Sequence, residues 1–167
     1  MKKLITILLM TLISTAYSAY DKDAFQTQVT ALTGSWGVAS QNTLDTALTN
    51  ATTDAEKIEI AKIMANKFKG NAAYIAGYVA QKIDPNQAGA LAAAFNGIDG
   101  LTTDQKKAVG TAIAVVHPGN ETAIAAALPG VSAEELAAAV SESATTGQSA
   151  AIITDYVNNL NTSPTNP

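Results

Sequence analysis

Short apolar stretches at helical spacing, separated by breaks that contain Gly, Pro or Asn, run through most of this chain. Phe25, Val29 and Leu32, for example, fall on one face of a helix because they are four and three residues apart. Pro cannot continue a helix and Gly is favoured just past its end, so the breaks mark helix ends. Alanine, the best helix former, supplies about a fifth of the residues. The pattern predicts an all-α fold built from antiparallel helical hairpins.

Nine helices are expected, and polar residues mark where several of them begin. Thr53 with Glu56 and Ser132 with Glu135 form capping boxes, in which a hydroxyl and a carboxylate satisfy the first free amides of a helix. Asp21 or Asp23, Asn71 and Asn120 are further candidate caps. The expected helices cover residues 24–32, 41–48, 54 to the break at 70, 72–83, 86–95, 103–116, 121–128, 133–140 and 148–160, with a turn at 145–147.

Three segments share one plan, in which a Thr or Ser cap, a helix, a Gly-containing break and a second helix follow each other. They begin at Thr53, Thr103 and Ser132, and a shift of 50 residues aligns the first two. Alanine-rich helices also align by chance, so a true repeat and an accidental similarity both stay open. A true repeat predicts a short, degenerate α-solenoid or superhelical bundle, in which each hairpin packs only against its neighbours.

The N-terminus has the three-part order of a secretory signal peptide. Lys2 and Lys3 precede the apolar run 4–13, and small residues follow, with Ala16 and Ser18 at the positions that signal peptidase reads. We expect cleavage after Ser18, with Ala16 and Ala19 as other cleavage points and an uncleaved membrane anchor as the alternative. The run is shorter than the about 20 residues of a spanning helix. The prediction is a secreted or periplasmic protein with a signal at 1–18, one helical domain at 19–160 and a disordered tail at 161–167.

The composition argues against several classes of partner and cofactor. The chain has no cysteine and one histidine, which disfavours a zinc site because such sites need three or four N or S ligands. Its basic residues are all lysine, and removal of Lys2 and Lys3 takes the net charge from −4 to −6. Arginine is the preferred residue for phosphate and base-edge contacts. We therefore expect no metal, no cofactor, no nucleic-acid partner and no stable membrane insertion after signal cleavage.

Three aromatic residues are the candidate binding residues. Tyr74 and Tyr78 are four residues apart and share a helix face, while Trp36 lies in a loop between Gly34 and Gly37. Trp and Tyr are enriched in binding hot spots, although the same residues also fill the core of an alanine-rich bundle. The single histidine, His117, precedes Pro118 at a predicted helix end, where it suits the helix dipole.

The leading functional hypothesis is an exported, non-enzymatic scaffold or protein-interaction protein, whose protein partner the sequence does not identify. One alternative is a carrier of a small apolar ligand, with an enclosed pocket around Tyr74 and Tyr78. The other is a hydrolase assembled in space near His117, which requires a carboxylate and a hydroxyl within hydrogen-bond reach of the imidazole. No catalytic residue is predicted from the sequence alone.

Overall fold

A computed structural model describes residues 20–146, which form eight α-helices and no β-strand. The predicted all-α fold is confirmed for this part of the chain. The predicted signal at 1–18, the predicted helix at 148–160 and the predicted tail at 161–167 lie outside the described residues. The helices are α1 (Lys22–Ala31), α2 (Val38–Asn50), α3 (Asp54–Lys67), α4 (Ala72–Ala80), α5 (Ala88–Asn96), α6 (Thr103–Val116), α7 (Glu121–Ala127) and α8 (Ala133–Thr146), with short 3₁₀ turns before α4 (Lys69–Asn71) and α5 (Pro85–Gln87).

Local capping explains where four helices begin. Asp21 accepts from the amides of Asp23 and Ala24 at 3.0 Å and so caps α1. Both predicted capping boxes form, at the start of α3 and at the start of α8. A third box, which was not predicted, joins Thr102 to Gln105 at the start of α6. The side chain of a Thr or Ser cap thus satisfies an amide that the helix itself leaves unpaired.

Other predicted boundaries need correction. α2 begins at Val38, three residues before its predicted start, and α8 continues to Thr146 through the predicted end at 140 and into the predicted turn. Asn71 and Asn120 do occupy N-cap positions, but neither side chain makes a cap hydrogen bond. A bend of the backbone precedes each of these two helices, with φ near −105° and ψ near 10° at the cap, and this geometry differs from the extended one of a side-chain cap.

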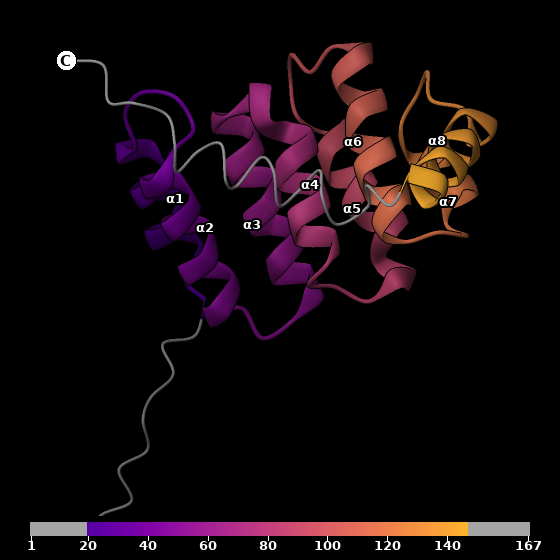
Figure 1. Ribbon diagram of the computed structural model, residues 1–167. Helices are drawn as coiled ribbons and strands as arrows, with labels where there is room; N and C mark the ends of the chain where they lie inside the picture. Colours follow the sequence, from indigo (N-terminus) through magenta and orange to yellow (C-terminus); the bar gives the residue numbers. More distant parts are fainter. Residues whose placement is uncertain (1–19, 147–167) are drawn as a thin grey trace, which may run out of the picture.

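The helices are stacked in chain order, from α1 at one end of the molecule to α8 at the other (Figure 1). The main packing contacts join helices that are one or two positions apart in the chain, such as α3 with α4 and α4 with α6. Contacts limited to near neighbours are the defining property of a solenoid. The described residues therefore have the near-neighbour packing of a short α-solenoid, and their buried apolar side chains form one hydrophobic cluster.

The two hairpins that the sequence pairs are equivalent in structure, but the shift between them is 49 residues and not 50. Thr53 and Thr102 are both the N-cap of a 14-residue helix with a capping box. Phe68 and His117 are both the C-cap, with nearly the same backbone angles. The same shift also pairs buried core residues: Ile60 with Val109, Met64 with Ile113, Ile75 with Ile124, and Val79 with Leu128.

The core of the described residues is made mainly of Ile, Leu, Val and Met side chains, with alanines packed between them. Ala61, Ala65, Ala76 and Ala92 are fully buried, and Phe95 is the largest fully buried side chain. Helices can approach closely where a side chain is absent. A Cβ atom built on Gly110 of α6 would lie only 3.2–3.4 Å from the side chains of Leu128, Val131 and Leu136. None of the described helices is both long enough and apolar enough to cross a bilayer.

Candidate binding site

The three predicted binding residues lie together in one row of aromatic rings. Trp36, from the loop between α1 and α2, packs edge-on against Tyr74 with ring centroids 5.6 Å apart. Tyr74 stacks on Tyr78, one turn further along α4, at 5.9 Å and 18° between the rings. Phe68 closes the row behind Trp36 at 5.3 Å. The row thus fixes the loop of Trp36 against α4.

The members of the row differ in their access to solvent. Trp36 is only 6% exposed, and its indole Nε1 has no hydrogen-bond partner among the described residues. Tyr74 and Tyr78 are half-buried. Trp36 therefore serves mainly as packing within the row, whereas the tyrosines keep a part that a partner could contact.

Two polar residues of α2 hold the tyrosines of α4. The Tyr74 hydroxyl donates to Gln41 Oε1 at 2.7 Å, and the Tyr78 hydroxyl donates to Asp45 Oδ1 at 2.6 Å. Gln41 Nε2 donates to the same Asp45 oxygen at 3.1 Å. Gln41 and Asp45 are one helical turn apart, as are the two tyrosines, so the pairs match in register.

Burial raises the pKa of the Tyr78 phenol, and its hydrogen bond to the Asp45 carboxylate raises that pKa further. The phenol is therefore a stable hydrogen-bond donor near neutral pH, where an ordinary tyrosine is also protonated. The same effect, led again by burial, raises the pKa of Tyr20 to about 12. Neither phenol is poised to lose a proton near neutral pH.

An open hollow of about 260 Å³ lies beside Tyr78, and we call it the α2–α4 hollow. It is lined by Asp45, Leu48, Thr49, Tyr78 and Lys82. The Lys82 ammonium lies over the ring of Tyr78, 4.7 Å from its centroid, which is a cation–π distance. The hollow thus has a carboxylate at the hydroxyl end of an aromatic ring and an ammonium over the face of that ring.

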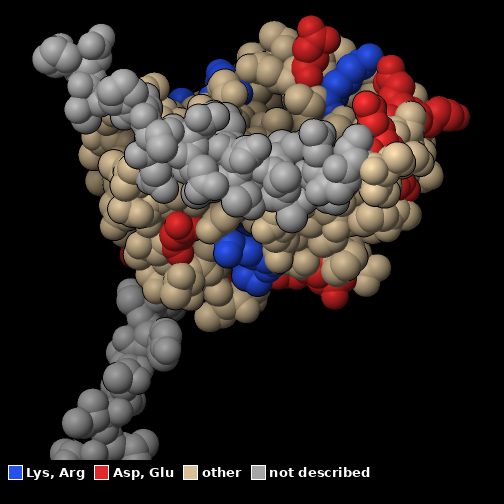
Figure 2. All heavy atoms as spheres, in the orientation of Figure 1, with Lys and Arg blue, Asp and Glu red and all other residues tan. Residues whose placement is uncertain are grey.

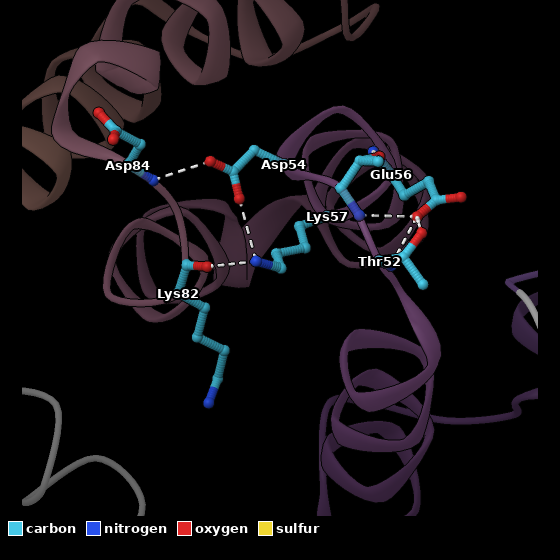
Figure 3. A network of polar contacts seen from close by, with 7 residues as sticks. Thr52, Asp54, Glu56, Lys57, Lys82 and Asp84 are labelled. Carbon is cyan, nitrogen blue, oxygen red and sulfur yellow. Dashed lines mark hydrogen bonds and ion pairs between the residues drawn. The ribbon is translucent and has the colours of Figure 1, made fainter. Parts of the chain in front are cut away.

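A network of hydrogen bonds, which we call the clasp, fixes the segment after α4 that contains Lys82. The Lys57 ammonium donates to the Lys82 carbonyl at 2.8 Å and pairs with Asp54 at 3.0 Å. The other Asp54 oxygen accepts from the Asp84 amide at 2.9 Å. Figure 3 shows that the Lys82 side chain extends away from this clasp. The Asp84 amide, and then the Lys57 ammonium, hold the pKa of the Asp54 carboxyl below its usual value.

His117 is the C-cap of α6, as predicted, and is 8% exposed. No described residue forms a hydrogen bond with its Nε2 atom. The described residues therefore do not provide, at Nε2, the polar contact that the hydrolase hypothesis requires.

The described part of the chain offers little support for the other chemical hypotheses. No group of three or more His, Asp or Glu residues within it is arranged to hold a metal ion. The α2–α4 hollow is open to solvent and carries two charged side chains, so it differs from the enclosed apolar pocket that an apolar-ligand carrier requires. On the part of the surface that Figure 2 leaves uncovered, lysines appear in small groups near acidic side chains and form no continuous basic stripe.

Sequence reasoning missed Gln41, Asp45 and Lys82. The i, i+4 spacing of Gln41 and Asp45 was a usable signal, because it equals the spacing of Tyr74 and Tyr78. That spacing does not tell which helices are neighbours, however, and α3 separates α2 from α4 in the chain. The position of Lys82 over Tyr78 depends on the clasp, which brings together residues some 25 to 30 positions apart.

Comparison with known proteins gives no relative from which a role for these residues could be transferred: no family model, no curated protein and no solved structure matches this chain.

Proposed function

We propose that this chain is an exported, non-enzymatic protein-interaction protein, and that its contact surface is centred on the α2–α4 hollow. The observation that carries the proposal is the pair Tyr74 and Tyr78 on α4, hydrogen-bonded to Gln41 and Asp45 of α2, with the hollow beside it. Export rests on the N-terminal sequence pattern.

The arrangement is of a kind that suits recognition. Binding hot spots are enriched in Tyr and Trp, and a partly exposed ring that is already held in place loses little entropy on binding. Tyr78 is held by Asp45 and by its stack on Tyr74. A solenoid is also a common frame for protein recognition, because its stacked hairpins present an extended surface.

The absence of an evident reaction centre in the described residues is a weaker support. The carboxylates of Glu56 and Glu135 accept hydrogen bonds in capping boxes, where they have a structural role. The described contacts of His117 also match a structural role.

The test is quantitative capture of partners from the native exported fraction by the tagged chain 19–167. The informative variant is Thr49→Trp, because Thr49 is exposed and a bulky ring there fills the hollow. The matched control is Thr27→Trp on α1. Both threonines are exposed and both hydroxyls bond the carbonyl four residues earlier, at 2.8 Å and 2.9 Å.

We expect at least one protein to be captured by the wild type and by Thr27→Trp, and to be strongly depleted with Thr49→Trp. Circular dichroism of both variants checks that the helices remain. Equal capture by all three chains would contradict a contact surface at the hollow. Recovery of the chain only inside the cytoplasm, with residues 1–18 still attached, would contradict export.

A further inference from the structure

We propose that the α2–α4 hollow is a binding site for a small zwitterion, which carries one ammonium and one carboxylate on a short apolar body, as a free α-amino acid does. This inference goes beyond the proposed interaction with a protein partner. It rests on the charges of the hollow, on how each is held and on the volume of the hollow.

The first charge is the half-buried carboxylate of Asp45. Its hydrogen-bond partners in the described residues are the Tyr78 hydroxyl and the Gln41 amide, both neutral. No lysine of the described part comes within ion-pair distance of it. A partly buried carboxylate without a cationic partner favours the approach of a cation from solvent. Asp45 thus supplies the place for the ligand ammonium.

The second charge is the ammonium of Lys82. It lies over the Tyr78 ring and, within the described residues, forms no ion pair. Its main chain is fixed, because its carbonyl oxygen accepts from Lys57 (Figure 3). The exposed Lys82 side chain therefore starts from a rigid point at the edge of the hollow, where it supplies the place for the ligand carboxylate.

The remaining lining and the size of the hollow select a small ligand. Leu48 supplies the apolar part of the lining and Thr49 a hydroxyl-bearing one. About 260 Å³ is at or below the lower end of the range of pockets that bind drug-sized molecules, roughly 300–1,000 Å³. The hollow has one negative and one positive group, so a zwitterion can pair with both, whereas a singly charged ligand leaves one of them unpaired.

The experiment is an NMR titration of the ¹⁵N-labelled chain 19–167 with L-leucine. Two matched probes each lack one charge: Nα-acetyl-leucine has no ammonium, and leucinamide has no carboxylate. We expect leucine to give saturable shifts of amides around Asp45, Thr49 and Lys82, with half-saturation on the order of 1 mM, because Lys82 is exposed and Asp45 is only half-buried. Each single-charge probe should need about fivefold more ligand.

Two variants test the assignment of the charges. Asp45→Asn should weaken leucine about fivefold and bring its affinity down to that of Nα-acetyl-leucine for the wild type. Lys82→Ala should also weaken leucine binding about fivefold, down to the affinity of leucinamide for the wild type. Lys67→Ala is the control, since Lys67 is exposed on α3 and lies outside the hollow.

No saturable shift with leucine at about ten times the expected half-saturation concentration would overturn the proposal. Equal affinities for leucine and both probes would also overturn it, because the hollow would then not distinguish ligands by their charged groups. Neither result bears on the capture experiment, in which the wild type binds a partner and Thr49→Trp does not. Failure of this inference can therefore be told from failure of the proposed function.

Discussion

The Tyr78 hydroxyl donates a hydrogen bond of 2.6 Å to the carboxylate of Asp45, across two helices that are not consecutive in the chain. One turn away, Tyr74 makes the corresponding bond to Gln41 at 2.7 Å. The two bonds fix both the distance and the register between α2 and α4. They also connect the N-terminal helices to the rest of the stack, which has consequences for stability at alkaline pH.

The wild type should lose stability as the pH rises above about 10. The folded state raises the pKa of Tyr78, so the unfolded chain releases this proton at a lower pH than the folded one. The stabilisation is complete below the unfolded pKa and is lost as the pH rises through the folded pKa. Tyr78→Phe has no such proton, so its free energy of unfolding should fall less steeply over the same range.

Urea unfolding followed by circular dichroism, in steps between about pH 8 and pH 11, measures this difference. Tyr20→Phe is the comparison, because the folded state raises the pKa of Tyr20 as well, to about 12. Tyr20→Phe should likewise make the free energy of unfolding fall less steeply with pH than it does in the wild type. If the free energy of unfolding falls equally steeply with pH in the wild type and in Tyr78→Phe, the Tyr78 phenol proton does not contribute to the pH dependence of stability.

The N-cap of α6 provides a test of the 49-residue shift. Thr102 accepts from the Gln105 amide, whereas Thr103 is the first residue inside the helix. Thr102→Ala should therefore cost about 1 kcal/mol of the free energy of unfolding, and so should Thr53→Ala at the equivalent cap. Thr103→Ala should change it by less than about 0.5 kcal/mol. Chemical denaturation measures all three, and a larger loss for Thr103→Ala than for Thr102→Ala would favour the shift of 50.

Gly110 should not accept a side chain. Val at this position would press against Leu128, Val131 and Leu136, which already lie within 3.4 Å of an added Cβ. We expect a loss of about 1–3 kcal/mol in the free energy of unfolding. Gly70→Val is the matched substitution, because an added Cβ there meets nothing within 4 Å. A similar loss in thermal or urea unfolding for both variants would argue against close packing of α6 on the C-terminal helices.

His117→Phe should leave the stability unchanged or raise it by about 1 kcal/mol. The imidazole is buried, and its Nε2 atom has no partner among the described residues, so the substitution removes a polar atom that is costly to bury. The equivalent cap residue of the first hairpin is already a phenylalanine, Phe68. Differential scanning calorimetry compares the two chains. A clear drop in the melting temperature would show that the imidazole makes a polar contact that matters.

Local signals gave the helices with good accuracy where a side chain caps the first turn. The starts of α3 and α8 follow from their capping boxes, since a cap acts over three or four residues and can be seen in the sequence. The ends were less accurate. α8 runs on to Thr146 in place of the turn expected at 145–147, and the Thr145 hydroxyl bonds the Ser141 carbonyl within the helix.

By itself, the sequence determined the fold class, the number of helices between residues 20 and 146 and the grouping of Tyr74 with Tyr78. All three follow from helical periodicity and from short-range capping and stop signals. Only the tertiary structure decided the 49-residue register, the contact between α2 and α4 and the charged surroundings of Tyr78. These depend on which helices become neighbours, and alanine-rich helices with similar surfaces can pair in many ways until the packing of the whole stack selects one.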